Sequence, residues 1–347
     1  MSRLGEVLET ARRARGLTQA ELAELASVTQ AALSRYENDL REPDSAALES
    51  VASALGVTVE FLRHAGRARA GMAVDVHMRR RATAPPGVWR RLEAQLNVYR
   101  WHASHLFEEV SMRAENHVPA FDPLDVTPVA AARIVRAQWR MPAGPVRSLA
   151  QWLESAGCLL IAQDFGTARV DGLSQWFGDY PIVLFNETAP TDRRRLTLAH
   201  ELGHLVLHAD PTASDDVEAD ANAFAAEFLM PADVIRPSLR NLKIGQLHDL
   251  KREYGVSMQA LVERAYHLGL LSPSQRTSMY KMFSAKGWRT REPGSGDLVP
   301  ERPELAMSIG KSLRDRGLTD NEVAHIAGFA DAGHNDLFRA SALRAVW

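Results

Sequence analysis

Leu198-Ala-His200-Glu201-Leu-Gly-His204-Leu-Val-Leu207 is a short apolar stretch that contains the pattern His-Glu-x-x-His. Residues four apart on an α-helix lie on the same side of it, so the two imidazoles would point in one direction. Two neutral imidazole nitrogens can bind one Zn²⁺, and Glu201 lies beside them, placed to accept a proton from a metal-bound water. The stretch therefore predicts a buried metal-binding helix, with His200 and His204 as ligands and Glu201 as the catalytic base.

A catalytic zinc site also needs a third protein ligand and an open position for water. The candidates are His208, four residues after the motif, and three acids of the next amphipathic segment, Asp216, Glu218 and Asp220. On one straight helix His208 would sit about 12 Å from the first histidine, which is too far for one ion. The spacing leaves the three acids open. Zn²⁺ fits such a ligand set best, although Mn²⁺ or Fe²⁺ can also occupy a site of two histidines and one carboxylate.

The first 66 residues read as a compact group of helices, because apolar residues recur there at helical spacing. Gly16 ends one helix, and Thr18 begins the next, with Glu21 three residues later completing a capping box. Seven arginines stand against ten acids, a net charge of −3 for these residues. Because phosphate contacts supply much of the affinity for DNA, this part alone would bind DNA modestly and with strong dependence on salt.

The sequence from Gly16 to Asn38 resembles the Cro/CI-like (XRE) helix-turn-helix, and the resemblance covers about residues 3–63. It implies a double-stranded DNA operator as partner, read by a homodimer. The first helix of the pair would cross the phosphate backbone, and the second would enter the major groove. The implied contacts to DNA are Gln19, Thr29, Gln30, Ala31, Ser34 and Arg35.

The sequence from about Val129 to Leu271 resembles the ImmA/IrrE-type zinc metallopeptidases. The resemblance rests on His200–His204, on Glu218–Ala225 and on Leu229-Met230-Pro231. By that match Glu218 is the third metal ligand. It implies hydrolysis of a peptide bond in a narrow substrate, a helix-turn-helix repressor or the chain itself, to control stress, prophage or mobile-element genes.

Two other functions stay open. In the first, the peptidase-like domain is a non-catalytic ligand sensor in a transcription regulator. In the second, the chain is an antitoxin-like regulator of a two-gene mobile element. A peptidase would also need a group that stabilises the oxyanion, and Tyr180, Arg195 and Tyr266 are candidates.

Composition narrows the class of protein. The 347 residues are 46% hydrophobic and 24% charged, with a net charge of −2, which is the balance of a globular protein without a polybasic field. A single cysteine, Cys158, excludes an internal disulfide framework. No apolar run approaches the roughly 20 residues that span a bilayer, and the first ten residues do not form a signal peptide. We expect a cytoplasmic protein without membrane contact.

These patterns predict a mainly α fold. It comprises a helix-turn-helix bundle, an α+β zincin-like domain with a small three-stranded sheet, and a helical C-terminal tail. The expected divisions are 1–66 for the DNA-binding domain, 67–126 for a basic linker and helical connector, 127–272 for the metallopeptidase domain, and 273–347 for the tail. The expected strands are Cys158–Ala162, Val170–Phe177 and Ile182–Asn186. A weak repeat relates Arg13–Ala23 to Arg314–Ala324, each joining a helix to a capped helix through a glycine.

Overall fold

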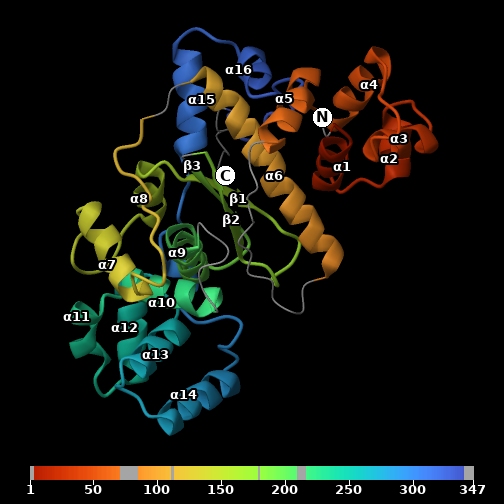
Figure 1. Ribbon diagram of the computed structural model, residues 1–347. Helices are drawn as coiled ribbons and strands as arrows, with labels where there is room; N and C mark the ends of the chain where they lie inside the picture. The colour runs from red at the N-terminus through yellow and green to blue at the C-terminus, as the bar shows by residue number, and fades with distance from the viewer. Residues whose placement is uncertain (1–3, 71–84, 111–112, 179, 209–215, 340–347) are drawn as a thin grey trace, which may run out of the picture.

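The computed structural model describes residues 4–70, 85–110, 113–178, 180–208 and 216–339 (Figure 1). These residues are mainly helical, as predicted. The α-helices are α1 (Leu4–Ala14), α2 (Gln19–Leu25), α3 (Gln30–Glu37), α4 (Ser45–Leu55), α5 (Val59–Ala70), α6 (Pro86–Glu109), α7 (Pro128–Gln138), α8 (Leu149–Ser155), α9 (Thr191–Leu207), α10 (Val217–Leu229), α11 (Ala232–Ile235), α12 (Ile244–Tyr254), α13 (Met258–His267), α14 (Pro273–Ala285), α15 (Leu305–Asp315) and α16 (Asp320–Ile326). Two short 3₁₀ helices span Arg236–Leu239 and Ser295–Asp297.

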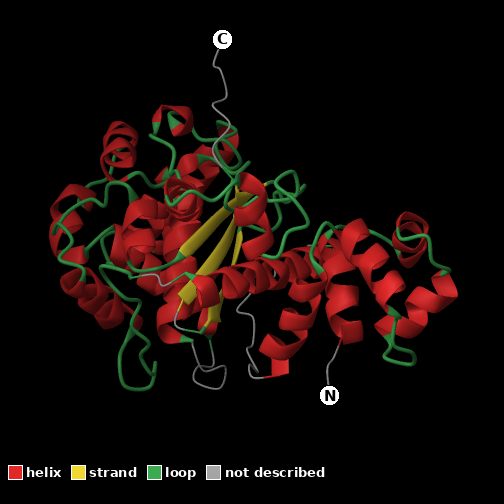
Figure 2. Cartoon of the chain, turned by 90° about the horizontal axis from the view of Figure 1, so that it is seen from above, coloured by secondary structure: helices red, strands yellow, loops and turns green. Residues whose placement is uncertain are grey.

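The predicted three-stranded sheet is present, with strands β1 (Leu159–Gln163), β2 (Gly172–Phe177) and β3 (Tyr180–Asn186) in the order β1-β3-β2. β3 pairs in parallel with β1 and antiparallel with β2, and Figure 2 shows helices on both sides of the three strands. The central strand is apolar from Pro181 to Phe185 because both of its faces are covered. Ile182 and Leu184 pack in the core on the α6 side, and Val183 and Phe185 pack in the core that contains α9.

Helices α1 to α5 surround a separate core that includes Leu8, Leu22 and Phe61. The capping box predicted at the start of the second helix is present, with Thr18 and Glu21 bonding each other's backbone N–H. Both views place these helices at one side of the molecule, away from the sheet (Figures 1 and 2). We call them the N-terminal module.

Helix α6 joins the N-terminal module to the sheet, and Figure 1 shows it running between them. Trp101 is buried in the core of the module, and Leu96 and Leu106 are buried against the sheet. The helical connector expected within residues 67–126 covers only Pro86–Glu109, and it begins at a proline because proline suits the first turn of a helix. The expected basic linker differs too: residues 67–70 continue α5 and 86–91 belong to α6, while 71–84 lie outside the described residues.

The last described residues pack against the rest of the chain. Ile309 and Leu313 of α15 and Val323 of α16 lie in the core beside α6 and the sheet. The capping box of Thr319 and Glu322 repeats that of the N-terminal module, as the sequence repeat suggests. Among the described residues, no helix long and apolar enough to cross a membrane is found.

The segment 327–338, which we call the strap, holds the N-terminal module by main-chain hydrogen bonds. Val57 and Phe329 form an antiparallel bridge, in which the Thr58 N–H donates to Gly328 O and the Ala330 N–H to Gly56 O, both at 3.0 Å. The ring of His102, from α6, lies stacked between those of Phe61 and Phe329, at centroid distances of 4.1 and 3.8 Å. Burial lowers the pKa of His102 to about 3, so the ring is neutral and its Nδ1–H donates to Ala327 O.

Candidate metal centre

The His-Glu-x-x-His motif lies in the second half of α9, a single buried helix that crosses beside the sheet. His200, Glu201 and His204 are each about 1% exposed. Gly203, between the two histidines, allows α10 to approach, since a Cβ there would come within 3.1 Å of the Ala221 backbone. The close contact of α9 and α10 brings the segment that contains Glu218 to the His-Glu-x-x-His motif.

Three side chains converge at this contact: His200, His204 and Glu218. The two histidine Nε2 atoms lie 3.0 Å apart. Glu218 Oε2 lies 3.6 Å from His200 Nε2, and Glu218 Oε1 lies 3.4 Å from His204 Nε2. Ligands about 2.0–2.1 Å from a tetrahedral Zn²⁺ lie about 3.3 Å from one another. The donor set therefore fits one zinc ion in both chemistry and spacing.

The other nitrogen of each histidine meets a second side chain. Asn222 Oδ1 lies 3.1 Å from His200 Nδ1, and His208 Nδ1 lies 3.2 Å from His204 Nδ1. His208 Nε2 in turn lies 3.7 Å from an oxygen of Asp220. Such contacts fix the orientation of an imidazole and the nitrogen that it presents to a metal.

Glu201 is held by the edge strand β2. The Ser174 hydroxyl donates a hydrogen bond of 2.7 Å to Glu201 Oε2. Gly172 makes room for the glutamate, because a Cβ there would lie 2.6 Å from Thr197 Cγ2 and 3.0 Å from Glu201 Oε1. The carboxylate is thus fixed against β2.

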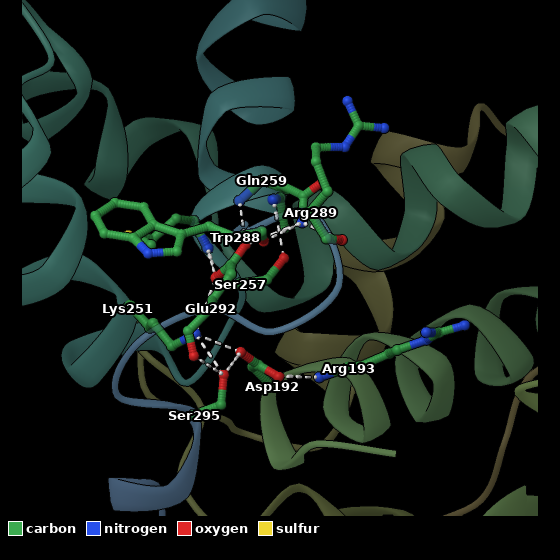
Figure 3. Close-up of polar contacts among 11 residues, drawn as sticks. Asp192, Arg193, Lys251, Ser257, Gln259, Trp288, Arg289, Glu292 and Ser295 are labelled. Carbon is green, nitrogen blue, oxygen red and sulfur yellow. Dashed lines mark hydrogen bonds and ion pairs between the residues drawn. The ribbon is translucent and has the colours of Figure 1, made fainter. Parts of the chain in front are cut away.

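The first turn of α9 is held by a buried charge cluster (Figure 3). Lys251 Nζ, 1% exposed, donates to Asp192 at 2.5 Å, to Glu292 at 2.9 Å and to Ser295 at 2.8 Å. Glu292 also accepts the backbone N–H of Met258 at the start of α13. One lysine therefore ties the metal-binding helix to α12, α13 and the segment after α14.

The rival ligands occupy other places. Asp216 is the N-cap of α10, where its side chain accepts the Ala219 N–H at 3.0 Å. Asp220 faces His208, which caps the C-terminus of α9. Neither acid belongs to the group of convergent ligand atoms found among the described residues. The ligand roles of His200, His204 and Glu218 and the catalytic role of Glu201 stay predictions.

The three oxyanion candidates differ in their surroundings. The Arg195 guanidinium is buried, paired with Glu301 and bonded to Val146 O. The Tyr180 ring packs edge-on against Phe107, and an arginine side chain stacks over the Tyr266 ring. Reading the sequence missed Ser174 and Asn222. The position of Asn222 near the site could have been predicted, because it follows Glu218 by four residues and therefore lies on the same helix face.

The predicted contacts to DNA lie on α2 and α3. Gln30, Ala31 and Arg35 are exposed on α3, and Ser34 is half-buried. Thr29 is the N-cap of α3, and the Gln19 amide donates to Glu37 at 2.8 Å. The roles of these six residues in binding DNA stay predictions.

Two family models match the chain. Residues 153–266 match the peptidase family described as the IrrE N-terminal-like domain, and residues 8–62 match the helix-turn-helix family. A search of curated proteins found no match. The two predicted resemblances are confirmed: one chain carries an XRE-type helix-turn-helix and an IrrE/ImmA-like peptidase domain.

Proposed function

We propose that the chain is a DNA-binding regulator that is also a zinc-dependent endopeptidase of narrow specificity. Its substrate is a helix-turn-helix repressor bound near the same operator, or the chain itself. The observation that supports catalysis is the convergence of two imidazole nitrogens and one carboxylate. Glu201, the residue after His200, is buried and accepts a hydrogen bond from Ser174. Zn²⁺ is the ion that this ligand set fits best, with Mn²⁺ and Fe²⁺ as alternatives.

In this proposal His200, His204 and Glu218 hold the metal, and Asn222 and His208 orient the two imidazoles. The bound ion would polarise the scissile carbonyl and lower the pKa of water. Glu201 takes the proton of the attacking water on its carboxylate and delivers it to the leaving amine. Ser174, through its hydrogen bond, fixes the orientation of that carboxylate.

In this proposal the helix-turn-helix determines where on the DNA the peptidase acts. The N-terminal module would bring the peptidase to the operator at which its repressor is bound, acting as a homodimer in the cytoplasm. Arg35 and Gln30 on α3 are exposed, which supports the proposal that they contact bases. Cleavage of the repressor would then release the genes that it controls.

Metal content of the purified chain tests the site. We expect about one metal per chain in the wild type and a loss in His204→Ala and Glu218→Ala. Asp216→Asn is the matched control, because asparagine keeps the helix cap and Asp216 is not part of the convergent group. A wild type that takes up no metal after reconstitution would refute the metal centre.

Turnover is tested separately, by mapping new protein N-termini in cells that express the wild type or Glu201→Gln. The proposal predicts a cut in a helix-turn-helix regulator, or in the chain itself, that disappears in the variant. Identical N-termini in both cultures would argue for a metal-binding regulator without peptidase activity.

A further inference from the structure

A cavity of about 220 Å³ lies where the N-terminal module, α6, β1 and the strap meet. It shares no lining residue with the metal centre, so it is a separate feature of the fold. At about 30 Å³ for each water molecule, it has room for about seven waters or for one small metabolite. Pockets for larger cofactors are typically about 300–1,000 Å³.

The strap forms one wall of this cavity. Phe329, His334 and Asp336 line it from the strap, opposite residues of α1, α4 and α6. Gly56, at the end of α4, makes the close approach possible, because a Cβ there would lie 2.4 Å from the His334 ring. The cavity is therefore complete only while the strap is docked on the N-terminal module.

Two opposite charges border the cavity without pairing with each other. Arg15 is exposed, and its Nη1 donates to Leu55 O at 2.9 Å. Asp336 is also exposed, and its Oδ2 accepts the Tyr99 hydroxyl at 3.1 Å. Burial raises the pKa of the Asp336 carboxyl, and the charges of Arg339 and Arg15 oppose this shift, but the structure shows no ion pair between the described residues Arg15 and Asp336. A guanidinium and a carboxylate thus both border the cavity and are not paired with each other.

The rest of the lining has a polar part, formed by Gln95, Tyr99, His102, Gln163 and His334, and a larger apolar part. Ala11 and Ala14 of α1, Leu55 at the end of α4, Val98 of α6 and Phe329 of the strap contribute aliphatic or aromatic surface. A ligand that fits would carry an apolar part against these residues and two opposite charges at Arg15 and Asp336.

We propose that this cavity binds a free α-amino acid with an aliphatic side chain. The α-carboxylate lies against the Arg15 guanidinium, the α-ammonium against the Asp336 carboxylate, and the side chain fills the apolar part. The two charged groups of the ligand thereby pair with the two charged residues of the chain. This site does not depend on the peptidase activity proposed above.

Binding would stabilise the docked strap, because the ligand contacts the strap and the N-terminal module together. A ligand that binds only the complete site shifts the equilibrium toward it by mass action. The fraction of chains with a docked strap would therefore depend on the concentration of the amino acid, and the strap contacts the N-terminal module.

Calorimetric titration and thermal unfolding of the full chain with leucine, isoleucine, valine or methionine test the proposal. We expect at least one of them to bind in the millimolar range or tighter and to raise the unfolding midpoint. Two analogues of that amino acid, its amide and its deaminated acid, each lack one charge and should not bind.

Variants locate the site. Arg15→Met and Asp336→Asn should each weaken binding by about tenfold or more, since each removes one charge partner. Arg13→Met and Asp315→Asn are matched controls on α1 and α15, and neither residue lines the cavity. His204→Ala should bind the amino acid like the wild type, which separates this site from the metal centre.

Three results would overturn the proposal: no binding of any of the four amino acids at millimolar concentration, equal binding of the amide or the deaminated acid, or unchanged binding in both cavity variants. Because Asp336 is exposed, Asp336→Asn should fold even if loss of the Arg15 bond to Leu55 O destabilises the other variant.

Discussion

Ser174 and Glu201 are joined by a hydrogen bond of 2.7 Å between strand β2 and helix α9, and both side chains are buried. The serine is one partner that the structure gives to the carboxylate of the His-Glu-x-x-His motif. The proposed base is thereby oriented by the sheet.

Ser174→Ala should slow peptide hydrolysis without removing the metal. The alanine deletes a hydrogen bond to a buried carboxylate, which costs about 1–3 kcal/mol of stability. Metal content and the free energy of unfolding are measured together with cleavage. Ser278→Ala on the exposed face of α14 is the control. Full activity in Ser174→Ala would remove the orienting role.

Gly172→Ala should destabilise the chain by about 1–3 kcal/mol, because its Cβ meets Thr197 and Glu201 at 2.6 and 3.0 Å. Gly245→Ala is the matched control, since a Cβ there has open space and alanine favours the helix. Chemical denaturation measures both variants. A Gly172→Ala protein as stable as the wild type would show that β2 and α9 tolerate a wider separation.

His208→Ala should lower metal affinity by about 10–100-fold, because the contact that orients His204 is lost. Competition with a chelator measures the dissociation constant. His267→Ala, on an exposed histidine of α13, should have no effect. An unchanged affinity in His208→Ala would mean that the helix alone orients His204.

Lys251→Met should reduce the free energy of unfolding by about 3–5 kcal/mol, because it leaves the carboxylates of Asp192 and Glu292 buried without their cation. Lys311→Met, whose lysine forms an exposed pair with Asp315, should change it by less than about 1 kcal/mol. Urea titrations compare the two. Similar small losses in both variants would contradict the structural role of the cluster.

Glu154 predicts a pH dependence of stability. It accepts the backbone N–H groups of Glu304 and Leu305, and burial raises its pKa to about 7 from 4.5. A raised folded-state pKa contributes stability below pH 4.5, and this contribution is lost as the pH rises to about 7.

The wild type should therefore lose stability relative to Glu154→Gln between pH 5 and pH 8, by about 1 kcal/mol once solvent screening is allowed for. Glutamine keeps the acceptor oxygen and does not titrate. Denaturation of both proteins at several pH values measures the difference. Parallel stability curves would show that Glu154 does not titrate in this range.

The features predicted correctly from the sequence are those that depend on residues close together in the chain. Helical periodicity and a capping box placed α2, and the His-Glu-x-x-His spacing placed two imidazoles on one side of α9. The contact of Glu218 with this pair was available only through the resemblance. It depends on the close approach of α10 at Gly203, which no local pattern reports.

The long-range contacts could not be predicted. The bridge of Val57 with Phe329 joins segments with no common periodicity. Lys251 reads as a surface lysine, because its two acidic partners are 59 residues before it and 41 after it in the chain. The division of the chain at 66, 126 and 272 stays a prediction, since α6 belongs to two cores at once.

The bridge of Val57 with Phe329 can form only after the ribosome has synthesised both residues. At about 5–20 residues per second, synthesis takes roughly 15–55 s to pass from one partner to the other. Throughout that interval the newly made N-terminal module can fold but has no strap to hold it. The nascent protein therefore passes through a stage in which the helix-turn-helix module is present without the strap and without the complete peptidase-like domain.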